Sequence, residues 1–228
     1  MQHESQEKAQ SAKGEERSKS MALEIEVKLA IPDQGTFNRL LVVSALGAYV
    51  LGPPQIVSVV DYFYDTADMA MLNGGYACRL RREGDQVIAT VKGAGSATDS
   101  LHKRQELEAT ALAGVDPSTW PEGPARALAL ALTRGRPLKL LFELRQRRHR
   151  RAVQQGTRSI GQLSLDEVLV AMGERTLEWL ELEIELTEGE ISDLLGLREL
   201  LQRTFGLHPQ LESKFARALE WCNGTPVR

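Results

Sequence analysis

The sequence has little of what several classes of protein require. Its two cysteines, Cys78 and Cys222, make no disulfide framework, which favours a reducing compartment and a cytoplasmic location. No apolar run is long enough to span a membrane, and the polar segment 1–20 contains no hydrophobic stretch typical of a secretory signal. The formal net charge of −3 argues against a general nucleic-acid binder. We therefore expect neither a membrane nor a nucleic acid among the partners.

The composition that remains is that of a globular protein. Hydrophobic residues make up 42% of the 228 residues, enough to build a core. Segment 1–20 is rich in Gln, Glu, Lys and Ser and is expected to be disordered. The sequence thus predicts a disordered tail at 1–20, one folded domain at 21–222 and a short C-terminal tail at 223–228.

Five segments alternate charged with apolar residues at period two. The clearest are 24–28 (Glu-Ile-Glu-Val-Lys) and 181–185 (Glu-Leu-Glu-Ile-Glu), and the others lie at 79–81, 104–108 and 144–147. Because successive side chains of a strand point to opposite faces, each segment places its charges on one side. One such strand is typical of a solvated sheet. Several strands carrying both signs favour a shared polar interior.

A dry core could not hold these charges, because an unpaired buried charge is strongly unfavourable and a paired one rarely offsets its desolvation. A closed sheet resolves the conflict, since inner and outer faces alternate along every strand of a barrel. Lys and Arg in such a lumen would bind an anion, and carboxylates would bind hard metal ions. Together they describe a site for a metal-bound polyphosphate.

The motifs resemble those of the CYTH proteins, also called triphosphate tunnel metalloenzymes. The hallmark of that family is a Glu-x-Glu-x-Lys strand near the N-terminus, matched here by Glu24, Glu26 and Lys28. The resemblance extends from about Leu23 to Leu219 and implies an α+β fold, an eight-stranded antiparallel β-barrel with a hydrophilic lumen and helices packed outside. The further matching segments, in order, are 62–66 (Tyr-Phe-Tyr-Asp-Thr), 77–82, 90–92, 104–108, 163–166, 181–185 and 213–218.

Local patterns predict the elements of this barrel. Asp33 is expected to cap a helix that ends near Gly47, and the glycine-rich segment 93–100 is expected to be an exposed hairpin loop, because a strand follows it. After the first strand, the expected strands are 55–64, 76–82, 86–92, 104–111, 139–153, 159–170 and 175–187. Further helices are expected at 124–134, 190–205 and 212–222.

Basic residues of matching parity are the candidates for binding phosphate, because the planar fork of arginine binds phosphate oxygens bidentately. Arg148 and Arg150 have the opposite parity and are expected to point outward unless a bulge shifts the register. Alternatively, the run 145–151 forms a nucleic-acid patch, although it lacks interleaved aromatic residues. Lys214 reaches the tunnel mouth if the resemblance holds, whereas a lysine on a helix is otherwise commonly solvated. The phosphate-binding candidates are Lys28, Arg79, Arg81, Lys92, Arg104, Arg145, Arg147 and Lys214.

Carboxylates of the same strands are the candidates for binding Mg²⁺ or Mn²⁺, which prefer oxygen ligands. The resemblance favours the glutamates of segments 24–28 and 181–185 and two metal ions. No histidine has zinc-like spacing, so a zinc site is not expected. The candidate donors are Glu24, Glu26, Glu106, Glu108, Asp166, Glu181, Glu183 and Glu185.

The sequence therefore predicts metal-dependent hydrolysis of inorganic triphosphate, a small-molecule substrate, to diphosphate and phosphate. Glu26, Lys28 and Glu183 are the predicted catalytic residues, and a water oriented between metal and carboxylates attacks a terminal phosphorus in line. Inorganic triphosphate is preferred because the sequence has no evident aromatic clamp, although Trp179 shares the parity of Glu181. The protein is expected to be a monomer or a homodimer.

Other functions remain open at this point. A thiamine triphosphatase or a class IV adenylate cyclase would use the same tunnel with an organic triphosphate. A non-catalytic sensor of polyphosphate or nucleotide would also use it, but a pure anion binder has no use for so many glutamates.

Overall fold

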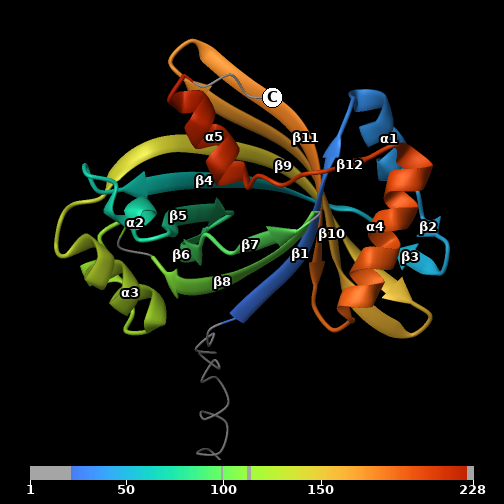
Figure 1. The fold of residues 1–228 in the computed structure, drawn as a ribbon, viewed down its shortest axis with the longest axis horizontal. Helices are drawn as coiled ribbons and strands as arrows, with labels where there is room; N and C mark the ends of the chain where they lie inside the picture. Colours follow the sequence, from blue (N-terminus) through green and yellow to red (C-terminus); the bar gives the residue numbers. More distant parts are fainter. Residues whose placement is uncertain (1–21, 99, 112–113, 225–228) are drawn as a thin grey trace, which may run out of the picture.

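The computed structural model describes residues 22–98, 100–111 and 114–224 (Figure 1). Its eight long strands form a closed antiparallel barrel, in which β9 pairs with β4 on one side and with β10 on the other. The predicted eight-stranded α+β barrel is confirmed. Around the ring the strands are β10 (Arg158–Met172), β11 (Arg175–Leu186), β1 (Ala22–Ile31), β8 (Leu101–Thr110), β6 (Gln86–Gly93), β5 (Tyr76–Glu83), β4 (Gln55–Asp65) and β9 (Lys139–Gln155).

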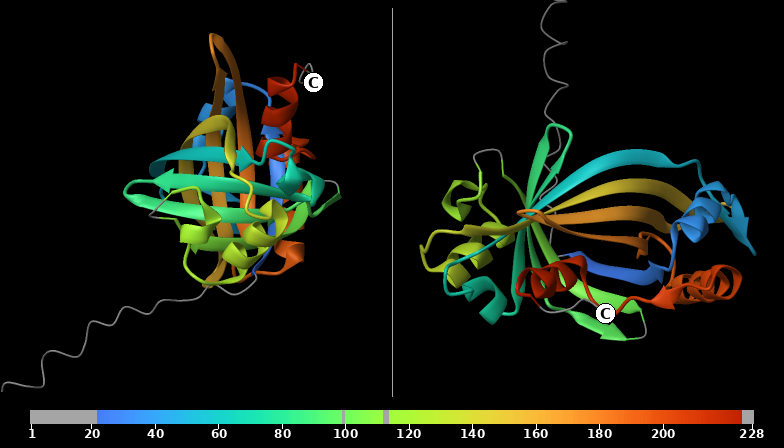
Figure 2. Two further views of the ribbon diagram at one scale, coloured as in Figure 1. Left: turned by 90° about the vertical axis from the view of Figure 1, so that its left-hand side faces the viewer. Right: turned by 90° about the horizontal axis from the view of Figure 1, so that it is seen from above.

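Helices flank the barrel on two opposite sides, and one further helix covers a mouth of the barrel (Figures 1 and 2). At one end, α1 (Gln34–Val42) and α4 (Ile191–Phe205) pack beside the short strands β2 (Ala45–Leu46) and β3 (Tyr49–Leu51). At the other end lie α2 (Ala70–Asn73), the 3₁₀ turn η1 (Pro117–Thr119) and α3 (Pro124–Thr133). The last helix, α5 (Lys214–Cys222), lies at the mouth. No helix in the described ranges combines the length and apolarity needed to cross a membrane.

Three apolar clusters hold these layers together. The first joins the outer faces of β1, β10 and β11 to α1 and α4, with Leu29, Leu165 and Leu182 fully buried. The second joins the outer faces of β5 and β6 to α2 and α3. The third lies inside the barrel, where Trp221 and Ala218 of α5 close over inward-facing residues of β4, β9, β10 and β11. The barrel wall is therefore buried on both faces over much of its surface.

The predicted start of the first helix is confirmed, since Asp33 caps it through a 2.7 Å bond from the Thr36 amide. Its predicted end at Gly47 is wrong. The helix ends at Val42, and the chain continues through the β-branched Val43 into a hairpin that places Leu46 and Leu51 in the core. Gly47 has a φ of +58° and makes the tight turn of that hairpin instead.

The segment 93–100 is also more ordered than a loop. Strand β7 (Ser96–Thr98) pairs with β8, and the carbonyl of buried Ser100 accepts a bond from the Lys28 amide at 3.0 Å. Another unpredicted strand, β12 (His208–Pro209), pairs with β1 and leads the chain from α4 toward α5. The predicted tail 1–20 lies outside the described residues, as do 225–228 of the predicted C-terminal tail.

Candidate active site in the barrel lumen

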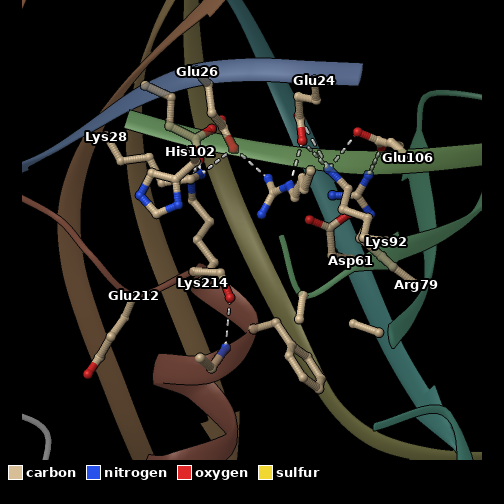
Figure 3. A pocket seen from close by; sticks show the side chains of 18 of the residues that line it. Glu24, Glu26, Lys28, Asp61, Arg79, Lys92, His102, Glu106, Glu212 and Lys214 are labelled. Carbon is tan, nitrogen blue, oxygen red and sulfur yellow. Dashed lines mark hydrogen bonds and ion pairs between the residues drawn. The ribbon is translucent and has the colours of Figure 1, made fainter. Parts of the chain in front are cut away.

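The barrel encloses a cavity of about 700 Å³ that all eight of its strands line, with α5 at one mouth (Figure 3). The period-two alternation creates it, because strands such as β1, β5 and β11 direct their charged residues inward and their aliphatic residues into the outer clusters. Phe63 and Phe215, whose ring centroids lie 5.2 Å apart, line the end of the cavity nearest α5. The site thus has a charged interior and an aromatic rim, which the sequence did not predict.

Most of the predicted phosphate-binding residues lie in this lumen. The Nζ atom of Lys214 lies 3.0 Å from Asp166, 3.0 Å from Glu181 and 2.7 Å from Glu183, so this lysine faces the tunnel and is not solvated. Burial alone would lower the pKa of Lys214, but these carboxylates raise it well above its usual range. The predicted cations that line the cavity are Lys28, Arg79, Arg81, Lys92, Arg104 and Lys214.

The prediction for β9 is wrong by one residue. The side chains of Arg145 and Arg147 are 67% and 59% exposed on the outer face, next to Glu143 and Glu167. Arg148 instead reaches into the lumen and contacts Asp166 at 2.6 Å and Glu183 at 2.7 Å.

The apolar end of the lumen explains this parity. The even-numbered Phe142 and Leu144 of β9 pack inside the barrel against the cluster beneath α5, so the even positions that follow also point inward. The odd positions Arg151 and Val153 pack outside instead, near α1. Charge alone predicts that Arg145 and Arg147 face the lumen, but the inward-facing row of β9 begins with apolar residues. Arg150 also has inward parity and binds Glu83 at one end of the barrel.

All the predicted carboxylates lie on the inner faces of their strands. Glu24, Glu26, Glu106, Glu108, Glu183 and Glu185 line the cavity, and Asp166 and Glu181 contact Lys214 beside it. Burial alone would raise the pKa of Glu183, but Lys214, Lys28 and Arg148 hold it well below its usual range. Glu183 is therefore ionised at neutral pH.

These charges form a continuous ring around the lumen, which we call the ion-pair belt. Consecutive members lie within 3.7 Å of each other, and a single neutral residue, Gln146, completes the ring by bridging Arg148 and Asp61. In order, the belt runs through Asp61, Arg79, Glu106, Lys92, Glu24, Arg104, Glu26, Lys28, Glu183, Arg148 and Gln146.

The belt includes residues that the sequence analysis missed. Asp61 lies on β4 between the inward-facing Val59 and Phe63, and an acidic residue in that apolar segment was the available signal. The correct parity of β9 would have placed Gln146 and Arg148 in the lumen as well. His102 also lines the cavity, and its Nε2 lies 2.9 Å from the Gln210 carbonyl, on the segment that leads to α5.

Trp179 is not an open aromatic clamp. Its ring is buried in the cluster beneath α5, its Nε1 donates to Glu181 at 3.0 Å, and the guanidinium of Arg217 lies over it. Any ring of a ligand would contact the aromatic rim at Phe63 and Phe215 instead.

The donor chemistry of the lumen fits divalent metal ions. Among the described residues no three acidic, histidine or cysteine side chains already converge on one point, because lysines and arginines hold the carboxylates apart. The lumen nevertheless holds nine carboxylates against seven cations, counting Glu108, Glu185 and Asp61. Burial raises the pKa of Glu185, and the nearby charges of Glu24, Glu26 and Glu106 raise it further. This end of the lumen therefore has an excess of negative charge. Hard cations would relieve that repulsion.

Comparison with known proteins matches this arrangement to a family. The CYTH domain matches residues 22–219, which is most of the chain. The protein belongs to the CYTH family. CYTH enzymes bind a triphosphate substrate and typically use divalent metal ions, and the comparisons leave the reaction and the substrate of this chain unresolved.

Solved structures share the fold at low sequence identity. A protein from Bacillus halodurans, provisionally described as an adenylate cyclase, is 19% identical with a TM-score of 0.59, over 86% of this chain and 97% of that one. HpAC1 from Hippeastrum, described as an adenylyl cyclase candidate with a dominant triphosphatase activity, is 18% identical with a TM-score of 0.56, over 89% and 97%. PH1819 from Pyrococcus horikoshii is 19% identical with a TM-score of 0.51, over 86% and 99%. These likenesses support the CYTH barrel and leave the substrate open.

Proposed function

We propose that this CYTH protein hydrolyses inorganic triphosphate to diphosphate and phosphate inside the barrel. The observation that supports this proposal most is the ion-pair belt, whose five cations, together with Arg81 and Lys214, surround one cavity of about 700 Å³. Such a volume is typical of small-molecule sites. The belt contains fixed cations for several phosphate oxygens and carboxylates for metal ions.

The cations bind and orient the substrate in this proposal. Lys28 and Lys214 approach Glu183 from two sides, and a phosphate oxygen near Glu183 would meet both amines. Arginine and lysine there neutralise the charge that develops in the transition state without donating a proton. The proposed phosphate-binding set is Lys28, Arg79, Lys92, Arg104, Arg148 and Lys214.

The carboxylates would hold two divalent ions, Mg²⁺ or Mn²⁺. When bound, such ions polarise phosphoryl oxygens and lower the pKa of a bound water. Glu183 stays ionised, so we assign it to orienting the attacking water by accepting a hydrogen bond, alongside Glu26 and Lys28. The proposed metal-binding set is Glu24, Glu26, Glu106, Glu108, Asp166, Glu181, Glu183 and Glu185.

A second candidate substrate is an organic triphosphate. The aromatic rim formed by Phe63 and Phe215, with Leu219 of α5 beside it, offers apolar surface that inorganic triphosphate would not use. This observation supports a thiamine or nucleoside triphosphate as the second candidate. A non-catalytic sensor would share the tunnel but would not need the excess of carboxylates.

The test is phosphate release from inorganic triphosphate, ATP and thiamine triphosphate, each with Mg²⁺, Mn²⁺ or a chelator. Metal-dependent release from inorganic triphosphate alone supports the proposal. Preference for an organic triphosphate moves the assignment to the second candidate. Binding without release, measured as a rise in melting temperature with triphosphate, supports the sensor and contradicts the enzyme proposal. The control variant is Glu167→Gln, which changes a carboxylate on the outer face of the barrel near Arg147 and should release phosphate as the wild type does.

A further inference from the structure

Asp61 is the one carboxylate of the belt that lies between two arginines of the same neighbouring strand. Its side chain is 2% exposed, and its two oxygens accept from Arg81 Nε and Nη2, both at 2.8 Å. Oδ2 also accepts from Gln146 at 2.7 Å, and Arg79 Nε lies 3.7 Å from Oδ1. Four donor groups thus surround this carboxylate, which leaves it poorly placed to bind a metal ion as well.

The two arginines are held differently. Arg81 makes a bidentate pair with Asp61, the strongest geometry for a guanidinium and a carboxylate. Arg79 makes only long contacts, 3.3 Å to Thr90, 3.4 Å to Glu106 and 3.7 Å to Asp61. Its residue is 7% exposed, and among the described residues its buried Nε has no hydrogen-bond partner. A buried, loosely held guanidinium that lines the cavity is ready to accept an anion.

The two guanidiniums would repel each other without Asp61. They occupy successive inward positions of β5, and burial and then Arg81 lower the pKa of Arg79. Burial alone would raise the pKa of Asp61, but Arg79 and Arg81 hold it well below its usual range. The carboxylate is therefore ionised and screens one arginine from the other.

We propose that Asp61 is a positioning residue that keeps Arg81 out of direct phosphate binding and holds Arg79 where a phosphoryl oxygen of the substrate arrives. This proposal rests on the triphosphatase function proposed above. Arg79 and Arg81 look equivalent in the sequence, but in this proposal Arg79 binds the substrate and Arg81 only pairs with Asp61. Gln146 supports the arrangement by donating to Oδ2 of Asp61 from β9, the strand that pairs with β4 on the side away from β5.

The proposal and a simple charge count predict opposite signs for Asp61→Asn. By charge count, removing a carboxylate from the lumen should strengthen the binding of an anion. If Asp61 positions the arginines, the same change lets them separate, and the affinity for triphosphate falls by about tenfold or more. The measurement is calorimetric titration of inorganic triphosphate with a chelator present, which needs no turnover.

A double-mutant cycle shows whether Asp61 acts through Arg81. Arg81→Met leaves Asp61 ionised and exposed to the substrate, so it should also weaken binding. The double variant Asp61→Asn/Arg81→Met removes a neutral pair and should lose less affinity than the product of the two single losses. If Asp61→Asn does not fold, Gln146→Leu replaces it, because this change removes the hydrogen bond to Asp61 Oδ2 without changing the charge of the lumen. The proposal then predicts weaker binding, whereas a charge count predicts no change. Glu167→Gln is the control and should bind as the wild type does.

The outcomes separate this proposal from the function on which it rests. Weaker binding by Asp61→Asn, partly restored in the double variant, supports it. Unchanged or tighter binding by Asp61→Asn overturns it and leaves the triphosphatase proposal standing. A lower melting temperature with unchanged affinity likewise overturns it, since Asp61 would then serve only the fold. If the wild type neither binds nor hydrolyses triphosphate, both proposals fall.

Discussion

The two faces of the barrel wall are both buried, yet they stabilise their charges in opposite ways. Arg148 and Arg151 lie three residues apart on β9 and show the difference. Arg148 faces the lumen and pairs with Asp166 and Glu183. Arg151 faces outward and donates to the backbone carbonyls of Leu40, Leu41, Leu51 and Gly52, and no carboxylate in the described part of the chain contacts it.

The outer face uses its arginine to complete the fold. Leu40 and Leu41 lie in the last turn of α1, where carbonyls lack intrahelical partners, and Arg151 satisfies them. Burial lowers the pKa of Arg151, and a group tied to carbonyls in this way is not available to a ligand. The outer face therefore contributes stability through apolar packing and satisfied backbone.

The inner face keeps its charges exchangeable. Each cation of the belt pairs with carboxylates that a divalent ion could take over, and each carboxylate pairs with cations that a phosphate could take over. Buried ion pairs contribute little net stability, because desolvation offsets their attraction. The same strands therefore stabilise the fold through the residues of their outer face and bind ligands through the residues of their inner face.

The largest expected effect comes from Glu183→Gln on the inner face of β11. The change removes the negative charge but keeps the shape, so we expect the protein to fold and its turnover to fall by about 10²–10³-fold. Steady-state phosphate release with the preferred metal measures it, and circular dichroism checks the fold. The same expectation holds for Glu26→Gln. Near-full activity in either variant would contradict its role in metal or water binding.

The neighbouring Leu182→Ala tests the outer face of the same strand. Leu182 is fully buried in the cluster under α1 and α4, so its truncation should lower the free energy of unfolding by about 2–5 kcal/mol. Turnover per folded molecule should stay near that of the wild type, because the side chain points away from the lumen. Urea denaturation and active-site titration measure the two quantities. A large loss of turnover with unchanged stability would show that the faces are not separable.

Asp61→Asn should lower stability in a pH-dependent way. The pKa of Asp61 lies below the ordinary 3.8, so its ionised form contributes stability that is present above that value and lost as the pH falls through the lower folded pKa. We expect the variant to be about 2 kcal/mol less stable than the wild type at pH 7, and the difference to shrink below pH 3.8. Denaturant titrations of the metal-free protein at pH 7, 5 and 3 measure it. A difference that grows on acidification would contradict the assigned ionisation.

Much of this architecture followed from the sequence, because period-two alternation directly encodes which face of a strand each residue occupies. Glu24, Glu26 and Lys28 were correctly placed on one face, as were Glu181 and Glu183. The helix cap at Asp33 depends on local contacts alone and was also predictable.

Parity failed on β9, where the inward row mixes apolar and polar residues. Leu144 packs under α5, a contact between segments that are about seventy residues apart and that local alternation cannot reveal. The belt as a whole was equally hidden, since Asp61 and Gln146 meet only when β4 and β9 pair in register. Sequence pattern thus gives the face of a residue, whereas the partners across the lumen depend on the closed sheet.

The smallest expected effect comes from Arg147→Ala, which should be compared with Arg148→Ala. Arg147 is solvated on the outer face and lies 3.6 Å from a half-exposed Glu167, so its removal should change stability by no more than about 0.5 kcal/mol and leave turnover unchanged. Arg148→Ala removes a belt cation next to Asp166 and Glu183, so triphosphate affinity should fall while the adjacent variant binds normally. Titration of both variants with triphosphate decides the register of β9. Equal losses in the two variants would mean that affinity follows the total positive charge of this strand and not the face on which each arginine lies.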